Sequence, residues 1–183
     1  MLQRIYADNS ATTALSLKAF EAMTPLFLNS YGNPSAIHSY GRAANAALED
    51  SRKKVAAALG GLSSEIFFTS GGTESDNWAI YHALKIKGAK KGRILASSIE
   101  HSAVLKPLER LREKGYEIDL VAPDKFGRVT AENLSQALGP DVVLASFMAA
   151  NNVVGTISEI KELSLLARQK GVLFHSDAVQ AAG

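Results

Sequence analysis

Short apolar runs and stretches with helical spacing alternate along most of this chain. Short runs rich in β-branched and aromatic residues are typical of buried strands, and apolar residues three or four apart are typical of helices. Strands are predicted at residues 66–69, 93–97, 116–121, 142–148 and 172–175. Helices are predicted at residues 74–87, 102–114, 131–138 and 158–170. This alternation predicts an α/β fold with a mostly parallel sheet and helices on both faces.

The first part of the chain has a different pattern. A short strand is predicted at residues 4–7 and helices at residues 16–28 and 40–59. Apolar or small residues recur at three- or four-residue spacing in the second helix, which predicts one buried stripe. The members of this stripe are Ala44, Leu48, Ser51, Val55, Ala58 and Leu59.

Composition narrows the class of protein. The 183 residues are 46% hydrophobic and 21% charged, as in ordinary globular proteins. A net charge of +2 and the lack of a Lys/Arg block give no reason to expect binding to nucleic acid or to a membrane. The chain has no cysteine, so it can form neither a disulfide nor a cysteine metal site by itself. Without a signal-peptide pattern, a cytoplasmic location is expected.

Polar and glycine residues follow the predicted strands, where parallel sheets bind their ligands. They are Gly71, Gly72, Thr73, Glu100, His101, Asn151, Asn152, Asp177 and Gln180. In "TSGGTESDN", a strand leads through two glycines into a helix, whose free N–H groups can bind an anion. The alternative is a capped helix after a tight turn, with Thr73 and Asp76 as a capping box. The stretch matches neither the P-loop nor the dinucleotide-binding motif.

Each of the other candidates also has a purely structural interpretation. His101 could stack on a flat cofactor or cap a helix, and Asp177 could hold a proton on a ring nitrogen or cap a turn. Asn152 could be a turn residue, and Gln180 is the weakest candidate. Together these groups could bind pyridoxal phosphate. The assignment of that cofactor rests on a family resemblance.

The resemblance rests on "IYADNSATT", "YGNPSAIHSYGR", "IFFTSGGTESDN", "SSIEHSAVL", "MAANNVVGTI" and "FHSDAVQAAG", in this order. The chain resembles the N-terminal half of a cysteine desulfurase, in the class V aminotransferase family of fold-type I pyridoxal-phosphate enzymes. The resemblance implies that residues 1–15 form an arm that packs with a small domain absent from this chain. Residues 16–183 would then form an incomplete cofactor-binding large domain.

The resemblance also implies roles for individual residues. Gly72 and Thr73 resemble the site of the cofactor phosphate, and Asp177 resembles the partner of the pyridine nitrogen. His101 resembles the catalytic histidine that stacks on the pyridine ring and moves protons.

Two amides complete the implied site. Asn152 resembles the asparagine near the phenolic oxygen and the substrate carboxylate. Gln180 resembles the residue that contacts the phenolic oxygen. No metal is implied.

The implied reaction converts L-cysteine to L-alanine and leaves the sulfur as a persulfide on an enzyme cysteine. The sulfur would pass to an iron–sulfur scaffold or another acceptor protein, and the enzyme would be a homodimer. The family's Schiff-base lysine and persulfide cysteine would lie beyond Gly183, so this chain is expected to be inactive without the C-terminal remainder of the enzyme.

Three other interpretations remain. Another class V aminotransferase or a selenocysteine lyase would differ mainly beyond Gly183. A non-catalytic interaction module could keep the fold, although it would not need the cofactor-type residues. A hydrolase using His101 and Asp177 is disfavoured because no G-x-S-x-G motif follows a strand.

Overall fold

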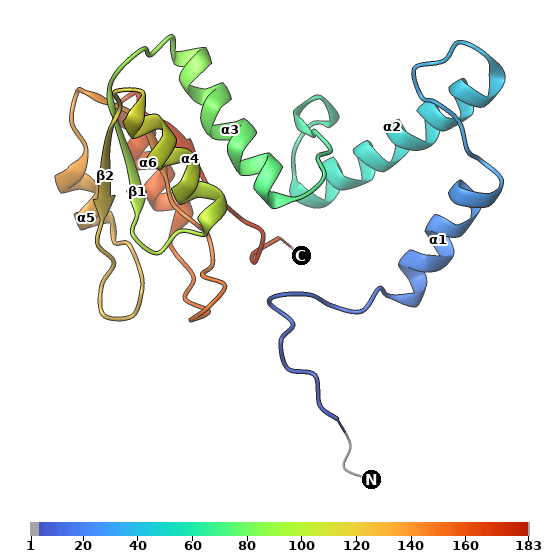
Figure 1. Ribbon diagram of the computed structural model, residues 1–183, viewed down its shortest axis with the longest axis horizontal. Coiled ribbons are helices and arrows are strands. Elements are labelled where there is room, and N and C mark those ends of the chain that lie inside the picture. Colours follow the sequence, from blue (N-terminus) through green and yellow to red (C-terminus); the bar gives the residue numbers. More distant parts are fainter. Residues whose placement is uncertain (1–3, 183) are drawn as a thin grey trace. The chain divides into compact units, whose positions relative to one another are not determined.

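A computed structural model describes residues 4–182 of the chain, which divides into two compact units, Met1–Phe68 and Thr69–Gly183. The second unit contains the alternating elements (Figure 1). They are α3 (Gly72–Lys87), β1 (Arg93–Ser97), α4 (Ser102–Glu113), β2 (Glu117–Val121), α5 (Ala131–Ala137), β3 (Val142–Ser146), α6 (Ile160–Gln169) and β4 (Leu173–His175). The observed bounds of each element differ from the predicted ones by at most two residues at either end.

All strands of the sheet run parallel, in the order β2-β1-β3-β4. Successive side chains of β1 point to opposite faces, with Leu95 on one face and Ile94 and Ala96 on the other. The predicted parallel sheet with helices on both faces is therefore confirmed.

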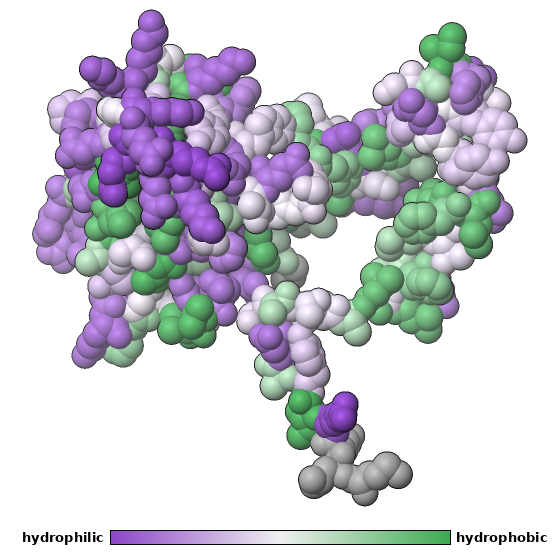
Figure 2. Space-filling model, in the orientation of Figure 1, coloured by the Kyte–Doolittle hydropathy of each residue, from purple (hydrophilic) through white to green (hydrophobic). Residues whose placement is uncertain are grey.

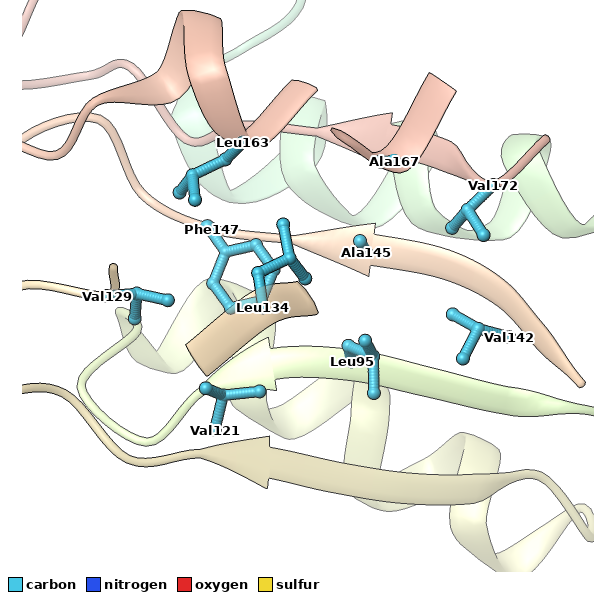
Figure 3. Packing of buried hydrophobic residues seen from close by; sticks show 10 residues of the cluster. All are labelled: Leu95, Val121, Val129, Leu134, Val142, Ala145, Phe147, Leu163, Ala167 and Val172. Carbon is cyan, nitrogen blue, oxygen red and sulfur yellow. The ribbon is translucent and has the colours of Figure 1, made fainter. Parts of the chain in front are cut away.

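A separate apolar cluster fills each face of the sheet. On one face, side chains from the sheet pack with those of α5 and α6 (Figure 3). These residues are Leu95, Val121, Val129, Leu134, Val142, Ala145, Phe147, Leu163, Ala167 and Val172. On the other face, α3 and α4 complete a second cluster. Its residues are Ile80, Leu84, Ile94, Ala96, Val104, Leu108, Leu111 and Leu144.

A register shift explains why β3 contributes side chains to both clusters. Arg93 pairs with Val142, whereas the next residue, Ile94, pairs with Leu144. The extra residue in β3 changes the alternation locally, so Val142 and Leu144 contribute to opposite faces although they are two positions apart.

An ion-pair network lies at the amino end of the sheet. The guanidinium of Arg93 contacts Asp141 at 2.8 Å and Asp119 at 2.9 Å. The hydrogen bond to Asp141 is the main factor that raises the pKa of Arg93, and it lowers the pKa of Asp141. This network lies at the end of β1 opposite to the candidate site residues.

The first unit contains α1 (Leu17–Leu28), α2 (Ser39–Leu59) and a short 3-10 helix, Ser63–Glu65. Ser16 caps α1 by accepting the N–H of Ala19, and the side chain of His38 caps α2. Within residues 4–182, no helix has both the length and the hydropathy needed to cross a bilayer.

Two predicted strands are wrong. Residues 4–7 and 66–69 form no strand, although Ile66 has an extended backbone. A strand needs a hydrogen-bonding neighbour, and neither segment pairs with another among the described residues. The apolar pattern alone could not reveal this lack of a partner.

The predicted buried stripe of α2 is also wrong. Only Gly41 and Ala56 of this helix are buried, and Leu59 is 61% exposed. The apolar side chains of α1 are exposed as well, and none of its residues is buried (Figure 2). Helical spacing identified the helix correctly, but only Ala44 and Leu48 of the predicted stripe are half-buried and its other members are exposed.

We expect Leu163→Ala in α6 to lower the free energy of unfolding by about 2–5 kcal/mol, because it leaves a cavity in the cluster of Figure 3. Leu165→Ala on the same helix is the matched control, since Leu165 is 49% exposed. Urea denaturation of both variants measures the difference. Equal losses in the two variants would contradict the assignment of this core.

Candidate functional site

The start of α3 lies beside the turn that follows β4. A methyl group added at Gly72 would come within 2.7 Å of Val179 Cγ2, so the absence of a side chain permits this approach. Val179 is between Asp177 and Gln180 in the chain. The structure therefore brings the predicted anion-binding helix end together with the turn that carries two other candidates.

The amino end of α3 retains the donors that an anion would use. The first N–H groups of a helix have no carbonyl partner within the helix. Gly71 is the N-cap and provides no side-chain cap. The Glu74 carboxylate accepts the N–H and hydroxyl of Ser70, which lowers the pKa of Glu74. Thr73 lies exposed in the first turn.

The predicted capping box of Thr73 and Asp76 is wrong. The helix starts two residues earlier than that pattern requires, with Gly71 instead of Thr73 at the N-cap. Asp76 instead lies buried and contacts the ring of His175 at 3.5 Å. The local spacing could not anticipate this partner because it lies in β4.

His101 is the N-cap of α4. Its Nδ1 accepts the N–H of Ala103 at 3.1 Å, so a neutral ring must carry its proton on Nε2. The residue is exposed. Asn77 of α3 donates to the carbonyl of Ala103 at 3.2 Å, which ties the start of α4 to α3. The ring is thus held at one nitrogen and free to act with the other.

Glu100 lies directly before His101 and is buried. One carboxyl oxygen, Oε1, accepts the hydroxyl of Ser97 at 2.5 Å and the N–H of Met148 at 2.9 Å. These bonds join the carboxyl end of β1 to that of β3. Oε2 is buried and has no hydrogen-bond partner among the described residues. Burial raises the pKa of Glu100 to about 7, and nearby Asp177 adds to this effect.

The loop after β3 is shaped by Asn151 rather than by Asn152. The buried side chain of Asn151 accepts the N–H groups of Val153 and Val154 and donates to the carbonyl of Ile99. Asn152 is the next residue and is half-buried. Asn151 therefore has a structural role, and it holds the loop that presents Asn152.

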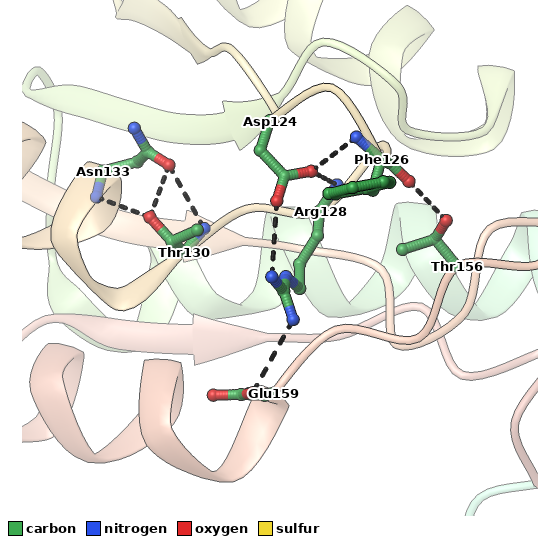
Figure 4. A network of polar contacts seen from close by, with 7 residues as sticks. All are labelled: Asp124, Phe126, Arg128, Thr130, Asn133, Thr156 and Glu159. Carbon is green, nitrogen blue, oxygen red and sulfur yellow. Dashed lines mark hydrogen bonds and ion pairs between the residues drawn. The ribbon is translucent and has the colours of Figure 1, made fainter.

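A polar network supports the same loop from the side of β2 (Figure 4). Asp124 accepts the N–H groups of Phe126 and Arg128, and Arg128 reaches Glu159 at 4.0 Å. Thr156 donates its hydroxyl to the carbonyl of Phe126. The loops after β2 and β3 are thereby joined.

Asp177 lies just beyond β4 and is only 7% exposed. Its Oδ1 accepts the N–H of Val179 at 2.9 Å, and its carbonyl accepts the N–H of Ala149. Gln180 follows in the turn and is exposed. A buried carboxylate beside a helix amino end can bind a ligand that has both an anionic group and a protonated ring nitrogen.

The sequence predicted no role for Glu100 or His175, and it favoured Asn152 over Asn151. The feature that could have identified these residues is a polar side chain directly after, or at the end of, an apolar parallel strand. That feature identifies the edge of the sheet but not the long-range partners. Among the described residues, no group of three or more His, Cys, Asp or Glu side chains is placed to hold a metal ion.

We predict that Glu100 makes stability depend on pH. The folded state keeps a proton that the unfolded chain releases between about pH 4.5 and 7, so the free energy of unfolding should fall as the pH rises through this window. The stabilisation is complete below about pH 4.5 and is lost above about pH 7. Its size is about 3 kcal/mol.

Glu100→Gln removes the titration and keeps an acceptor for Ser97 and Met148. Between pH 5 and 8, its free energy of unfolding should gain up to about 3 kcal/mol relative to the original protein. Urea denaturation at several pH values measures this gap, with Glu109→Gln on the exposed face of α4 as the control. Parallel pH curves for Glu100→Gln and the original protein would contradict the prediction.

Comparisons with known proteins identify relatives in sequence and in solved structure. Over 183 residues the chain is 44% identical to "Cysteine desulfurase IscS" of Dictyoglomus turgidum, covering 100% of this chain and 46% of the relative. The solved structure of a "NIFS-LIKE PROTEIN" has 40% identity and a TM-score of 0.93, and the match covers 98% of this chain and 50% of that one. "SspA in complex with cysteine" has 33% identity and a TM-score of 0.92, covering 96% and 51%.

The chain thus spans about half the length of the relatives it matches. The resemblance seen in the sequence is to their N-terminal half, and the comparisons support it. The family match itself runs over residues 5–183 and so covers nearly the whole chain. The chain belongs to the class-V aminotransferase family.

Proposed function

We propose that this chain is the cofactor-binding part of a pyridoxal-phosphate-dependent cysteine desulfurase. The reaction would convert L-cysteine to L-alanine and deliver sulfur for iron–sulfur clusters or thio-cofactors. The observation that carries the proposal is the approach of Gly72 to Val179. It sets a helix amino end beside the turn that holds the buried carboxylate of Asp177.

The residues present fit pyridoxal phosphate. Its phosphate suits the N–H groups at Gly72 and Thr73, where a side chain at position 72 would meet Val179. Its basic ring nitrogen suits Asp177, a carboxylate that is 7% exposed and therefore interacts strongly with a nearby positive charge. When bound, the cofactor supplies an electron sink for bond cleavage next to the amino group of the substrate.

The chain's own groups would hold and orient the reacting molecules. Asp177 would keep a proton on the ring nitrogen. His101 would stack on the ring with Nδ1 held by the backbone, which leaves Nε2 to move protons. Asn152 would bind near the phenolic oxygen and the substrate carboxylate, and Gln180 near the phenolic oxygen.

The sulfur acceptor must come from outside these residues, because the chain contains no cysteine. The proposed enzyme therefore needs a persulfide cysteine, and a lysine for the cofactor, in a further segment. We also propose a cytoplasmic homodimer that passes sulfur to an iron–sulfur scaffold or another acceptor protein, with residues 1–15 as an arm against the small domain. The names of the relatives and the cysteine complex of SspA support the proposed desulfurase activity.

With a thiol reductant present to free the persulfide sulfur as sulfide, the full-length product of this gene should form sulfide and L-alanine in equal amounts from L-cysteine. Measuring both products, together with keto acids, separates the candidate functions. Keto acid without sulfur would indicate an aminotransferase, and activity restricted to selenocysteine would indicate a lyase for that amino acid. Failure to bind pyridoxal phosphate would contradict the whole proposal and favour an interaction module.

Asp177→Asn should lower the turnover of L-cysteine by at least about tenfold, the effect of 1.4 kcal/mol on a barrier. The amide keeps an acceptor for the N–H of Val179, so the melting temperature should change little. Asp124→Asn is the matched control, because Asp124 also accepts the N–H two residues further along at 2.9 Å. Unchanged turnover in Asp177→Asn would reject the role of this carboxylate.

A further inference from the structure

A line of three polar side chains, of which two are buried and one is half-buried, lies next to the proposed site and is not used by it. The ring of His175 contacts Asp76 through Nε2 at 3.5 Å and the hydroxyl of Ser146 through Nδ1 at 2.8 Å. Asp76 is 4% exposed and Ser146 is fully buried. The line runs from α3 through β4 to β3.

This line joins the two elements that would bind opposite ends of the cofactor. Gly72 and Asp76 are four residues apart and lie on the same side of α3. On the other element, His175 and Val179 are also four residues apart. Gly72 meets Val179, and Asp76 meets His175, so α3 contacts β4 and its turn at two successive points.

His175 is also close to Asp177 in the chain. Alternate residues of an extended segment point to the same side, so the ring lies below the carboxylate. The bond from Ser146 fixes the ring from the neighbouring strand, and the N–H of Phe147 donates to the carbonyl of His175. The imidazole is therefore held on both nitrogens, and its backbone is held as well.

The contact with Asp76 has an energetic consequence. A buried carboxylate is costly unless it has a polar partner, and the ring of His175 contacts the carboxylate of Asp76 at 3.5 Å. Loss of the ring would leave Asp76 without that partner. The first turn of α3 would then be free to shift relative to β4.

We propose that His175, held by Asp76 and Ser146, is a positioning residue that fixes the separation between the amino end of α3 and Asp177. This inference rests on the proposed binding of pyridoxal phosphate. A short linker of one methylene group and one ester oxygen joins the phosphate to the pyridine ring, so the distance between the phosphate and the ring nitrogen varies only within a narrow range. The helix end and the carboxylate can therefore bind both groups at once only over a narrow range of separations.

The test compares two probes, pyridoxal 5′-phosphate and pyridoxal, which lacks the phosphate. The full-length gene product should bind the phosphorylated probe more tightly, and His175→Gln should reduce this preference by at least about tenfold. A misplacement of an ångström can cost about a hundredfold. Affinity for pyridoxal should change much less. Loss of stability alone would weaken both probes equally and leave the ratio unchanged.

The control is His82→Gln, an exposed histidine on α3. Asp76→Asn and Ser146→Ala remove the two partners in turn and should reduce the preference in the same direction. They also decide the question if His175→Gln fails to fold. An unaltered preference in the folded variants would overturn the role of His175. No preference in the original protein would instead overturn the proposed function.

Discussion

The parallel pairing of β3 with β4 is the interaction on which the candidate site depends. It continues beyond the strands, because Phe147 donates to His175 and Ala149 donates to Asp177. These backbone bonds place the loop of Asn152 beside the turn of Asp177. The apolar clusters exclude water from both faces of the sheet. The candidate site therefore lies at the edge where the strands end.

Burial divides the polar groups at this edge into two sets. Asp76, Glu100 and Asp177 are carboxyl groups that are at most 7% exposed, whereas Thr73, His101 and Gln180 are exposed. The buried groups are tied to neighbouring strands and helices. The exposed groups are attached to the same elements and face solvent. Precise binding of a small cofactor requires that the exposed binding groups are held in place by rigid, buried neighbours.

The parts of the fold that sequence predicted well are those set by local patterns. The strands β1 to β4 lie within two residues of their predicted bounds because each is a short apolar run. Residues 66–69 have the same pattern, but they lack a pairing partner. Likewise His101 was placed correctly after β1, yet His175, which contacts Asp76, lies in β4, and Met148, one of the two partners of Glu100, lies just after β3. Such long-range contacts leave no trace in local spacing.

A crystal structure of the full-length gene product grown with pyridoxal 5′-phosphate would show where the cofactor binds. We predict phosphate oxygens on the N–H groups of Gly72 and Thr73 and the ring nitrogen within hydrogen-bond distance of Asp177. A cofactor bound elsewhere, or with its ring nitrogen away from Asp177, would rule out the proposed site.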